Sequence, residues 1–312
     1  MRVCFYSSLS KHAQAGFYYR VKLPAKKLNI PIVHDPHQVY DYDIVHMWGF
    51  HEGDLYFIID LVYQGKKVII DLDDNIFKIP WLSFWNYLEE PEINEVYHLI
   101  ELAFNTAHAI TVTTEALKKV YQDYNKNVYV LPNCICLEDW EKVYSLPRFQ
   151  HEGILIGYQG SPSHKEDIEL VKNVIEDLTK EGITFMVWGV PLDIENIINV
   201  GFGSFKNFYS TLWRFNFDLL IAPLRDTDFN RCRSPIKVLE AGMAKTPILV
   251  SDVEPYKWLP DRFRVKEDWK TAIKEFLKRD LRKEGEELYN LVIDNFEIGK
   301  HIHKWRELYE SL

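Results

Sequence analysis

The sequence predicts an α/β protein built from parallel sheets with helices on both faces. Short β-branched or aromatic runs alternate with longer amphipathic segments along nearly all of the 312 residues, which is the pattern of consecutive βα units. A polar segment at residues 137–153, which contains Pro147, interrupts the alternation once before it resumes. We therefore expect two βα domains with a boundary near Phe149, and ligands at the carboxyl ends of the strands.

In the first half, the expected strands are short and apolar and the expected helices are amphipathic. The run Val68-Ile69-Ile70, flanked by charged residues, is typical of a strand buried on both faces. Strands are expected at residues 2–7, 44–47, 67–71, 109–112 and 128–131, and helices at residues 17–28, 54–63, 92–105 and 114–124.

The second half repeats this architecture without repeating the sequence. Pro247 opens a strand that ends at Ser251 and Asp252. Strands are expected at residues 154–158, 184–188, 217–222 and 248–250, and helices at residues 165–180, 235–245, 269–281, 284–295 and 301–312.

The composition is that of an ordinary globular protein, with 47% hydrophobic and 27% charged residues. The net charge of −9 disfavours a large nucleic-acid-binding surface, so no nucleic-acid partner is expected. The pattern of the first residues is that of a strand and not of a signal peptide, and no apolar run is long enough to span a bilayer. The cysteines fit neither a disulfide scaffold nor a paired zinc motif; they are Cys4, Cys134, Cys136 and Cys232. We expect a cytoplasmic location with reduced thiols.

Residues 231–252 are the most informative segment, because cations cluster there at a helix start. Ser234 is a favourable N-cap and Pro235 a favourable first helical residue, so the helix is expected to begin just after Arg231 and Arg233. Lys237 falls in its first turn. Helix amides and fixed cations both attract anions, so the segment predicts a phosphate or diphosphate site. The alternative is that the two arginines are solvated loop charges.

Glu240 lies about one helical turn beyond Lys237 and can share its face. A carboxylate at this place is positioned to accept ribose hydroxyls. The small residues Ala241, Gly242 and Ala244 indicate a helix face with something packed close to it. The alternative is an exposed Glu240 that pairs with Lys237.

Two histidines bracket the end of the second expected strand. His46 directly follows an apolar pair and also fits a core histidine whose ring nitrogens are satisfied within the fold. His51 is the better candidate for a ligand site.

Acidic and aromatic residues follow the third expected strand. Asp71-Leu-Asp73-Asp74 resembles the metal motif of GT-A glycosyltransferases and the nucleophile motif of haloacid-dehalogenase-type phosphatases, but the Gly-Thr that the phosphatases need next is absent. We expect no metal site; Asp73 or Asp74 would lie near an acceptor hydroxyl, fix a loop, or act as a base. The aromatic residues 77–87 form either an acceptor loop that faces a membrane or a buried connector.

Four segments, in the right order along the chain, resemble glycosyltransferase family 4 and its compact bacterial, archaeal and phage relatives. They are Asp43-Ile-Val-His46 with His51-Glu-Gly53, Leu131-Pro-Asn133-Cys-Ile135, Ile156-Gly-Tyr-Gln-Gly160-Ser161, and residues 234–252. The resemblance implies a GT-B architecture, in which two Rossmann-like domains face each other across a cleft. Residues 1–148 would form the acceptor-side domain and residues 149–295 the nucleotide-sugar domain. The final helix, residues 296–312, would cross back to the first.

The resemblance also implies an activity: transfer of a sugar from a nucleotide-diphospho-sugar to an acceptor, with retained configuration and without a metal or other cofactor. The implied catalytic residues are His51, Arg231 and Lys237, and the implied donor-binding residues are Gly160, Ser161, Arg231, Arg233, Lys237 and Glu240. The acceptor is left open as a glycan, lipid or protein, and peripheral membrane association is left open with it.

Cys232 departs from the family pattern, because many members carry a glutamate at this place ahead of the ribose-binding Glu240. This departure motivates one alternative, a non-catalytic nucleotide-sugar-binding subunit. A second alternative is a GT-B-fold nucleotide-sugar epimerase, which would need a set of acids around the donor sugar.

Overall fold

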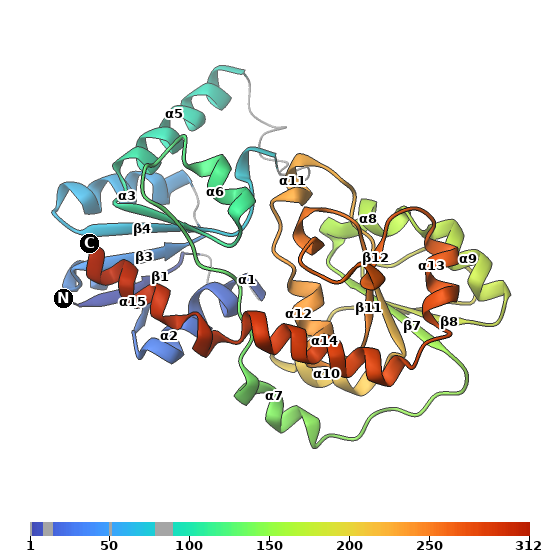
Figure 1. Cartoon of the computed structure of the whole chain (residues 1–312). Helices are drawn as coiled ribbons and strands as arrows, with labels where there is room; N and C mark the ends of the chain where they lie inside the picture. Colours follow the sequence, from blue (N-terminus) through green and yellow to red (C-terminus); the bar gives the residue numbers. More distant parts are fainter. Residues whose placement is uncertain (1, 9–14, 50–51, 79–89) are drawn as a thin grey trace. The chain divides into compact units, whose positions relative to one another are not determined.

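The computed structural model describes residues 2–8, 15–49, 52–78 and 90–312, and the chain divides into two compact units (Figure 1). Unit 1 comprises Met1–Cys134, Cys232–Ser234 and Ile298–Leu312. Unit 2 comprises Ile135–Arg231 and Pro235–Glu297. Each unit is an α/β domain with its own parallel sheet, as the sequence predicts.

The sheet of unit 1 has six strands in the order β2-β1-β3-β4-β5-β6, and every neighbouring pair is parallel. The strands are β1 (Val3–Tyr6), β2 (Ile32–Val33), β3 (Ile44–Trp48), β4 (Lys67–Leu72), β5 (Ala109–Val112) and β6 (Val128–Val130). The helices are α1 (Ala15–Phe17), a π-helical turn (Tyr18–Lys22), α2 (Leu23–Leu28), α3 (Glu52–Tyr63), α5 (Glu90–Thr106), α6 (Glu115–Tyr121) and α15 (Ile302–Ser311), with short 3₁₀ turns at Pro36–Asp41, Ile76–Lys78 and Ile298–Lys300.

The sheet of unit 2 also has six strands, in the order β12-β11-β10-β7-β8-β9, and is parallel throughout. Its strands are β7 (Leu155–Gly160), β8 (Thr184–Gly189), β9 (Ile198–Val200), β10 (Leu219–Ala222), β11 (Ile248–Ser251) and β12 (Arg264–Val265). Its helices are α7 (Leu137–Tyr144), α8 (Lys165–Glu169), α9 (Lys172–Lys180), α10 (Phe208–Phe215), α11 (Asp228–Arg231), α12 (Ile236–Met243), α13 (Trp269–Phe276) and α14 (Leu281–Phe296), with 3₁₀ turns at Pro162–His164, Phe205–Asn207, Glu254–Tyr256 and Asp261–Phe263.

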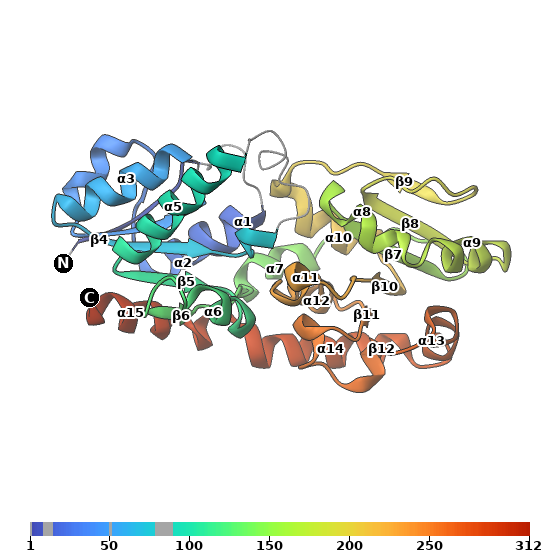
Figure 2. The same cartoon turned by 90° about the horizontal axis from the view of Figure 1, so that it is seen from above.

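In unit 1, alternate side chains of β3 serve opposite faces of the sheet. Val45 and Met47 join the apolar core that α3 and α5 close with Ile58 and Phe104. His46 lies on the other face, where the helices α2 and α15 run (Figures 1 and 2). This second face is polar at its centre.

The C-terminal helix α15 belongs to unit 1, which confirms the predicted return of the chain. Trp305 and Leu308 are buried, and the Tyr309 hydroxyl lies 2.9 Å from Nδ1 of His46. A hydrogen bond between a core strand and the last helix therefore anchors the end of the chain.

The chain leaves unit 1 earlier than the boundary at residues 148/149 that the sequence analysis places. It passes into unit 2 between Cys134 and Ile135, because α7 packs Trp140 and Val143 into the core of unit 2. The first turn of α7 is acidic, so the sequence of this segment resembles that of a polar linker although the segment is a helix.

Candidate functional site

The carboxyl end of β7 in unit 2 carries two of the predicted donor-site residues. Gly160 ends the strand, and Ser161 precedes the 3₁₀ turn Pro162–His164, with its Oγ 2.6 Å from the Oγ of Ser163. A Cβ atom at Gly160 would lie 2.5 Å from the hydroxyl of Tyr158, which is fully buried. Glycine is therefore required here, because the Tyr158 ring has no room to retreat.

Lys237, in the first turn of α12, reaches the same place. Its Nζ lies 3.3 Å from the Tyr158 hydroxyl and 4.5 Å from the centre of the Tyr158 ring. The ring face attracts the ammonium group and holds it beside the end of β7. The structure thus brings Lys237 and Gly160 together through Tyr158, a residue that the sequence analysis did not single out.

Glu240 is buried, with 4% of its surface exposed, so the alternative of an exposed Glu240 on the helix surface is wrong. Its Oε2 accepts a hydrogen bond of 3.0 Å from Nε2 of Gln159 on β7. The Oε1 of Gln159 is itself buried and has no hydrogen-bond partner among the described residues. A buried acid thus sits next to a buried amide oxygen that can still accept a hydrogen bond.

The small residues around Glu240 pack against α14. A Cβ atom at Gly242 would lie 2.6 Å from Cγ2 of Val292 and 3.2 Å from the carbonyl oxygen of Leu288. The close neighbour that this composition predicts is therefore a helix, and the small residues need no ligand to explain them.

A polar network at His164 and Asp167 was not found from the sequence, although its i, i+3 spacing at a helix start was visible. Nδ1 of His164 lies 2.8 Å from Oδ2 of Asp167, whose Oδ1 accepts hydrogen bonds from the amide of Arg225 (3.0 Å) and from Nδ2 of Asn230 (3.1 Å). Burial acts to raise the pKa of Asp167, but His164, the Arg225 amide and the charge of Lys237 hold it below its usual value. The network fixes the loop after β10 against the turn after β7.

The start of α12 differs from the prediction. The helix begins at Ile236 after Pro235, and no side chain caps it, so the predicted N-cap role of Ser234 is wrong. Arg231 ends α11, where its guanidinium makes a two-pronged ion pair with Asp226 at 2.7 and 3.0 Å. This pair is exposed, and exposed ion pairs are weak.

Asp71 is a structural residue of unit 1. Both of its oxygens accept hydrogen bonds of 2.8 Å from the fully buried guanidinium of Arg20, and Oδ2 also lies 3.2 Å from Nε2 of His46. Burial acts to raise the pKa of Asp71, but Arg20 and His46 hold it below its usual value. These contacts leave Asp71 no free oxygen for a metal, and they confirm His46 as a satisfied core histidine.

Asp73 and Asp74 follow β4 and have a different environment. Burial and the neighbouring charges of Asp74 and Asp71 raise the pKa of Asp73 to about 7. Burial also raises the pKa of Asp74, whose Oδ1 lies 4.0 Å from Nε of Arg233, and that cation acts in the opposite direction. Arg233 belongs to unit 1 with these acids, whereas Lys237 and Glu240 belong to unit 2.

Replacing Asp73 with Asn is expected to stabilise unit 1 more at pH 8 than at pH 5. The folded pKa of about 7 lies above the ordinary carboxyl value of 3.8, so ionisation favours the unfolded chain, and this penalty grows from pH 3.8 and is complete above pH 7. Because Asp73 keeps some contact with solvent, we expect a gain of about 1–2 kcal/mol at pH 8. Urea unfolding at both pH values measures it; an equal change at both would contradict the raised pKa.

Cys232, which departs from the family 4 pattern that the sequence resembles, packs in the core of unit 1. Nδ2 of Asn75 lies 4.0 Å from its Sγ, and Oγ1 of Thr114 donates to its carbonyl oxygen at 2.9 Å. All four cysteines are buried, and none of them forms a disulfide. A carboxylate in this core would be costly to bury, so the cysteine fits its surroundings.

Two predicted features fall partly or wholly outside the described residues. His51 lies outside them, as do residues 79–89 of the aromatic segment. Phe77, at its beginning, is half-buried and stacks on Tyr124 with ring centres 4.8 Å apart.

Two further observations apply to the described ranges. They contain no group of three or more His, Cys, Asp or Glu residues placed to hold a metal ion. None of their helices combines the length and the apolar character that crossing a bilayer requires.

Comparison with known proteins rests on structure alone, since the chain matches no protein-family model and no curated protein. A glycosyltransferase from Rickettsia africae is similar with a TM-score of 0.65 at 13% identity, covering 99% of this chain and 98% of that one. An alpha-glucosyltransferase in complex with UDP-glucose and abasic-site DNA has a TM-score of 0.68 at 11% identity, with 99% of both chains covered. The fold is that of the GT-B glycosyltransferases.

The GT-B fold is not restricted to sugar transfer. A UDP-GlcNAc 2-epimerase from Methanocaldococcus jannaschii is similar with a TM-score of 0.54 at 12% identity, covering 100% of both chains. At these identities the likeness establishes the architecture and leaves the reaction to be argued from the residues.

Proposed function

We propose that this chain is a GT-B glycosyltransferase, related to family 4, that uses a nucleotide-diphospho-sugar as its donor. The observation that carries the proposal is the arrangement at the carboxyl end of β7 in unit 2. There Gly160 lets the end of β7 lie close against the Tyr158 hydroxyl, Lys237 supplies a cation held over the Tyr158 ring, and Glu240 supplies a buried acid beside Gln159. Open α/β sheets bind ligands at this end of their strands.

Each of these groups matches one part of a nucleoside diphosphate. Lys237 would meet the diphosphate, with the amides of the turn at Ser161. Glu240 would accept hydrogen bonds from the ribose hydroxyls, and the unpartnered Oε1 of Gln159 would accept one more from the nucleoside. Arg231 would join only after exchanging Asp226 for the diphosphate.

The proposed chemistry follows from charge. As the bond to the anomeric carbon breaks, negative charge grows on the leaving diphosphate, and a fixed ammonium group beside it stabilises that charge. We propose retention of configuration by attack on the same face, with the leaving diphosphate accepting the proton of the acceptor hydroxyl, and no metal in the reaction. Asp73 or Asp74 of unit 1 would serve the acceptor, whose class (glycan, lipid or protein) is left to experiment.

The epimerase is the second candidate, favoured by the similarity to UDP-GlcNAc 2-epimerases. It predicts interconversion of a free nucleotide sugar at C2 without any acceptor. A non-catalytic subunit, suggested by Cys232, predicts binding without turnover of any kind.

The first test is a thermal-shift panel of UDP, GDP, ADP and their common sugar conjugates, with and without EDTA. A ligand at about one hundred times its dissociation constant adds roughly 2.7 kcal/mol of stability, which is easily seen. We expect one nucleotide class to stabilise the wild type regardless of EDTA, and to lose this effect in Glu240→Ala and Lys237→Met.

The stabilising conjugate is then followed by ¹H NMR. Release of free nucleoside diphosphate supports the transferase, a new C2 epimer supports the epimerase, and an unchanged spectrum with every acceptor class supports the binding subunit. No stabilisation by any nucleotide would overturn the donor site itself.

A further inference from the structure

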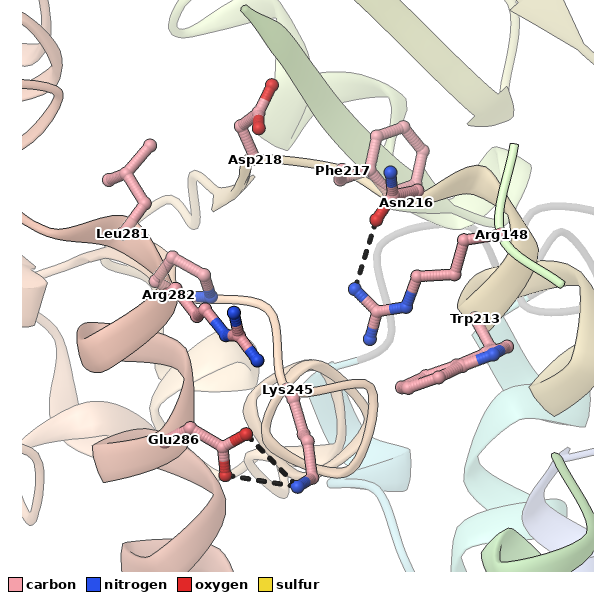
Figure 3. A pocket seen from close by; sticks show the side chains of 10 residues that line it. Arg148, Trp213, Asn216, Phe217, Asp218, Lys245, Leu281, Arg282 and Glu286 are labelled. Carbon is pink, nitrogen blue, oxygen red and sulfur yellow. Dashed lines mark hydrogen bonds and ion pairs between the residues drawn. The ribbon is translucent and has the colours of Figure 1, made fainter. Parts of the chain in front are cut away.

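Unit 2 also has a hollow at the amino ends of its strands, away from the carboxyl ends that carry the proposed donor site (Figure 3). Asn216, Phe217 and Asp218 line it and directly precede β10, and Pro247 lines it and directly precedes β11. Because the sheet is parallel, these are the amino ends of its strands, whereas Gly160 ends β7 at the carboxyl edge. The hollow is thus separated from the proposed donor site by the length of the strands.

The volume of the hollow is about 520 Å³, which is within the range of small-molecule sites. Its lining carries Arg148, Lys245 and Arg282 against Asp218 and Glu286, which is three positive and two negative charges. One of these pairs is already neutral, because Nζ of Lys245 lies 3.0 and 3.1 Å from the two carboxylate oxygens of Glu286. The excess positive charge of the lining therefore belongs to Arg148 and Arg282, since Asp218 is the one acid of the lining outside the Lys245–Glu286 pair.

Arg148 makes no ion pair with an acid among the described residues, and neutral partners hold its guanidinium group in place. It stacks on the ring of Trp213 at 3.5 Å, and it donates hydrogen bonds to Oδ1 of Asn216 (3.0 Å) and to the carbonyl oxygen of Ala244 (2.9 Å). Both acceptors are neutral. The stack and the two hydrogen bonds fix the plane of the group before any ligand arrives.

Arg282 faces Arg148 across the hollow. It is exposed, makes no hydrogen bond or ion pair within the described residues, and points its guanidinium into the same space (Figure 3). Burial lowers the pKa of Arg148, Glu286 and Tyr144 act to raise it, and the positive charge of Arg282 adds a smaller lowering. The two guanidinium groups therefore repel each other, and a dianion between them would remove that repulsion.

Asp218 does not neutralise either arginine. Its Oδ2 accepts a hydrogen bond of 2.7 Å from the amide of Leu155 and lies 3.8 Å from Nε2 of His151. The carboxylate therefore interacts with the start of β7 and not with the arginines. The open space between the arginines is thus left for an external anion.

We propose that this hollow binds a phosphate group, held between Arg148 and Arg282, at a site separate from the proposed donor site. Each planar guanidinium group can hold two oxygens of a tetrahedral phosphate, which is the geometry that arginine matches best. The phosphate belongs to a small phosphorylated molecule or to a phospholipid headgroup, since both present anionic phosphate oxygens, as a monoester in the first case and a diester in the second. This site does not depend on the activity proposed above.

The test is calorimetric titration of the full chain with inorganic phosphate and with glucose 1-phosphate, at constant ionic strength. Arg282→Gln is expected to weaken binding about tenfold or more, because a charged hydrogen-bonding partner is lost. Arg282 is exposed and makes no hydrogen bond or ion pair in the described chain, so this variant keeps the fold. Arg148→Lys keeps the positive charge but loses the paired N–H donors of the planar guanidinium group, and it is expected to weaken binding as well.

Two control variants locate the bound phosphate. Arg306→Gln, on the exposed surface of α15 in unit 1, changes the net charge equally and is expected to leave the affinity unchanged. Lys237→Met removes the cation of the donor site and is expected to leave the Arg282-dependent binding of phosphate unchanged. Phosphate affinity that falls in Lys237→Met but not in Arg282→Gln would overturn the proposal, as would an equal fall in Arg306→Gln and Arg282→Gln.

Vesicle binding separates the two sources of phosphate. Co-sedimentation with phosphatidylglycerol vesicles, absent with phosphatidylcholine and lost in Arg282→Gln, assigns the site to a lipid headgroup. Retained binding of glucose 1-phosphate without co-sedimentation assigns it to a soluble ester. If neither binding depends on Arg282, the hollow is not a phosphate site.

Discussion

Replacing Arg20 with Met is expected to reduce the free energy of unfolding of unit 1 by about 3–5 kcal/mol. Arg20 is 1% exposed and holds Asp71 through two hydrogen bonds of 2.8 Å. Its Nη1 also donates to the carbonyl oxygen of Leu131 at 2.6 Å and to Oδ1 of Asn133 at 3.2 Å. Without the guanidinium, the charge of Asp71 stays buried with only neutral partners, and a main-chain carbonyl loses its donor.

The remaining partners of Asp71 are the Thr111 hydroxyl and the His46 ring. Oγ1 of Thr111 donates to Oδ2 of Asp71 at 2.9 Å, so its hydroxyl accepts from the proton on Nε2 of His46 at 3.0 Å. Nδ1 of His46 is then the acceptor for the Tyr309 hydroxyl. Burial lowers the pKa of His46, Asp71 acts to raise it, and the charge of Arg20 lowers it further.

Urea denaturation followed by circular dichroism measures the loss, and hydrogen exchange of β4 and α15 assigns it to unit 1. The matched control is Arg231→Met, which removes an arginine from a two-pronged but exposed pair and is expected to leave the midpoint unchanged. The double variant Arg20→Met/Asp71→Leu is expected to cost less than the sum of its parts, because it removes both charges together. Equal midpoints for wild type and Arg20→Met would contradict the buried pair.

The network around Arg20 and Asp71 is a part of the fold that the sequence does not predict. The alternation of apolar runs and amphipathic helices predicts the long strands of both sheets, because that pattern is local. The edge strands β2, β9 and β12 have only two or three residues, too few to show a period. The pairing of Arg20 with Asp71 joins residues 51 positions apart, and no local pattern encodes such a contact.

The same distinction applies to the candidate site. Gly160, Lys237 and Glu240 stand out from the sequence by residue type and place along the chain. Their partners Tyr158 and Gln159 sit in an ordinary strand, 79 and 81 positions from the side chains they contact, so only the fold reveals them. The predicted capping by Ser234 is wrong for a similar reason, since local propensity names a good cap but tertiary packing sets where α12 begins.

Replacing Lys237 with Met is expected to lower the turnover of the donor sugar by about 10²–10³-fold, which corresponds to roughly 2.7–4 kcal/mol of lost charge stabilisation. The proposed role of Lys237 is to oppose the charge that develops on the leaving diphosphate, and this charge is greater in the transition state than in the bound donor. The loss is therefore expected mainly in kcat, with a smaller rise in KM. Release of nucleoside diphosphate from the donor that the binding panel identifies provides the assay.

The contrast with Glu240 makes this prediction specific. Glu240→Gln keeps a hydrogen-bonding side chain beside Gln159 but weakens the acceptor for the ribose hydroxyls. Because the ribose is bound equally in the donor complex and in the transition state, KM is expected to rise about tenfold with kcat nearly unchanged. Lys180→Met, at the exposed end of α9, is the matched control and is expected to change neither constant. A Lys237→Met enzyme with unchanged kcat would show that the ammonium group over Tyr158 only packs the site, and the charge that opposes the leaving group would then have to come from Arg231 or Arg233.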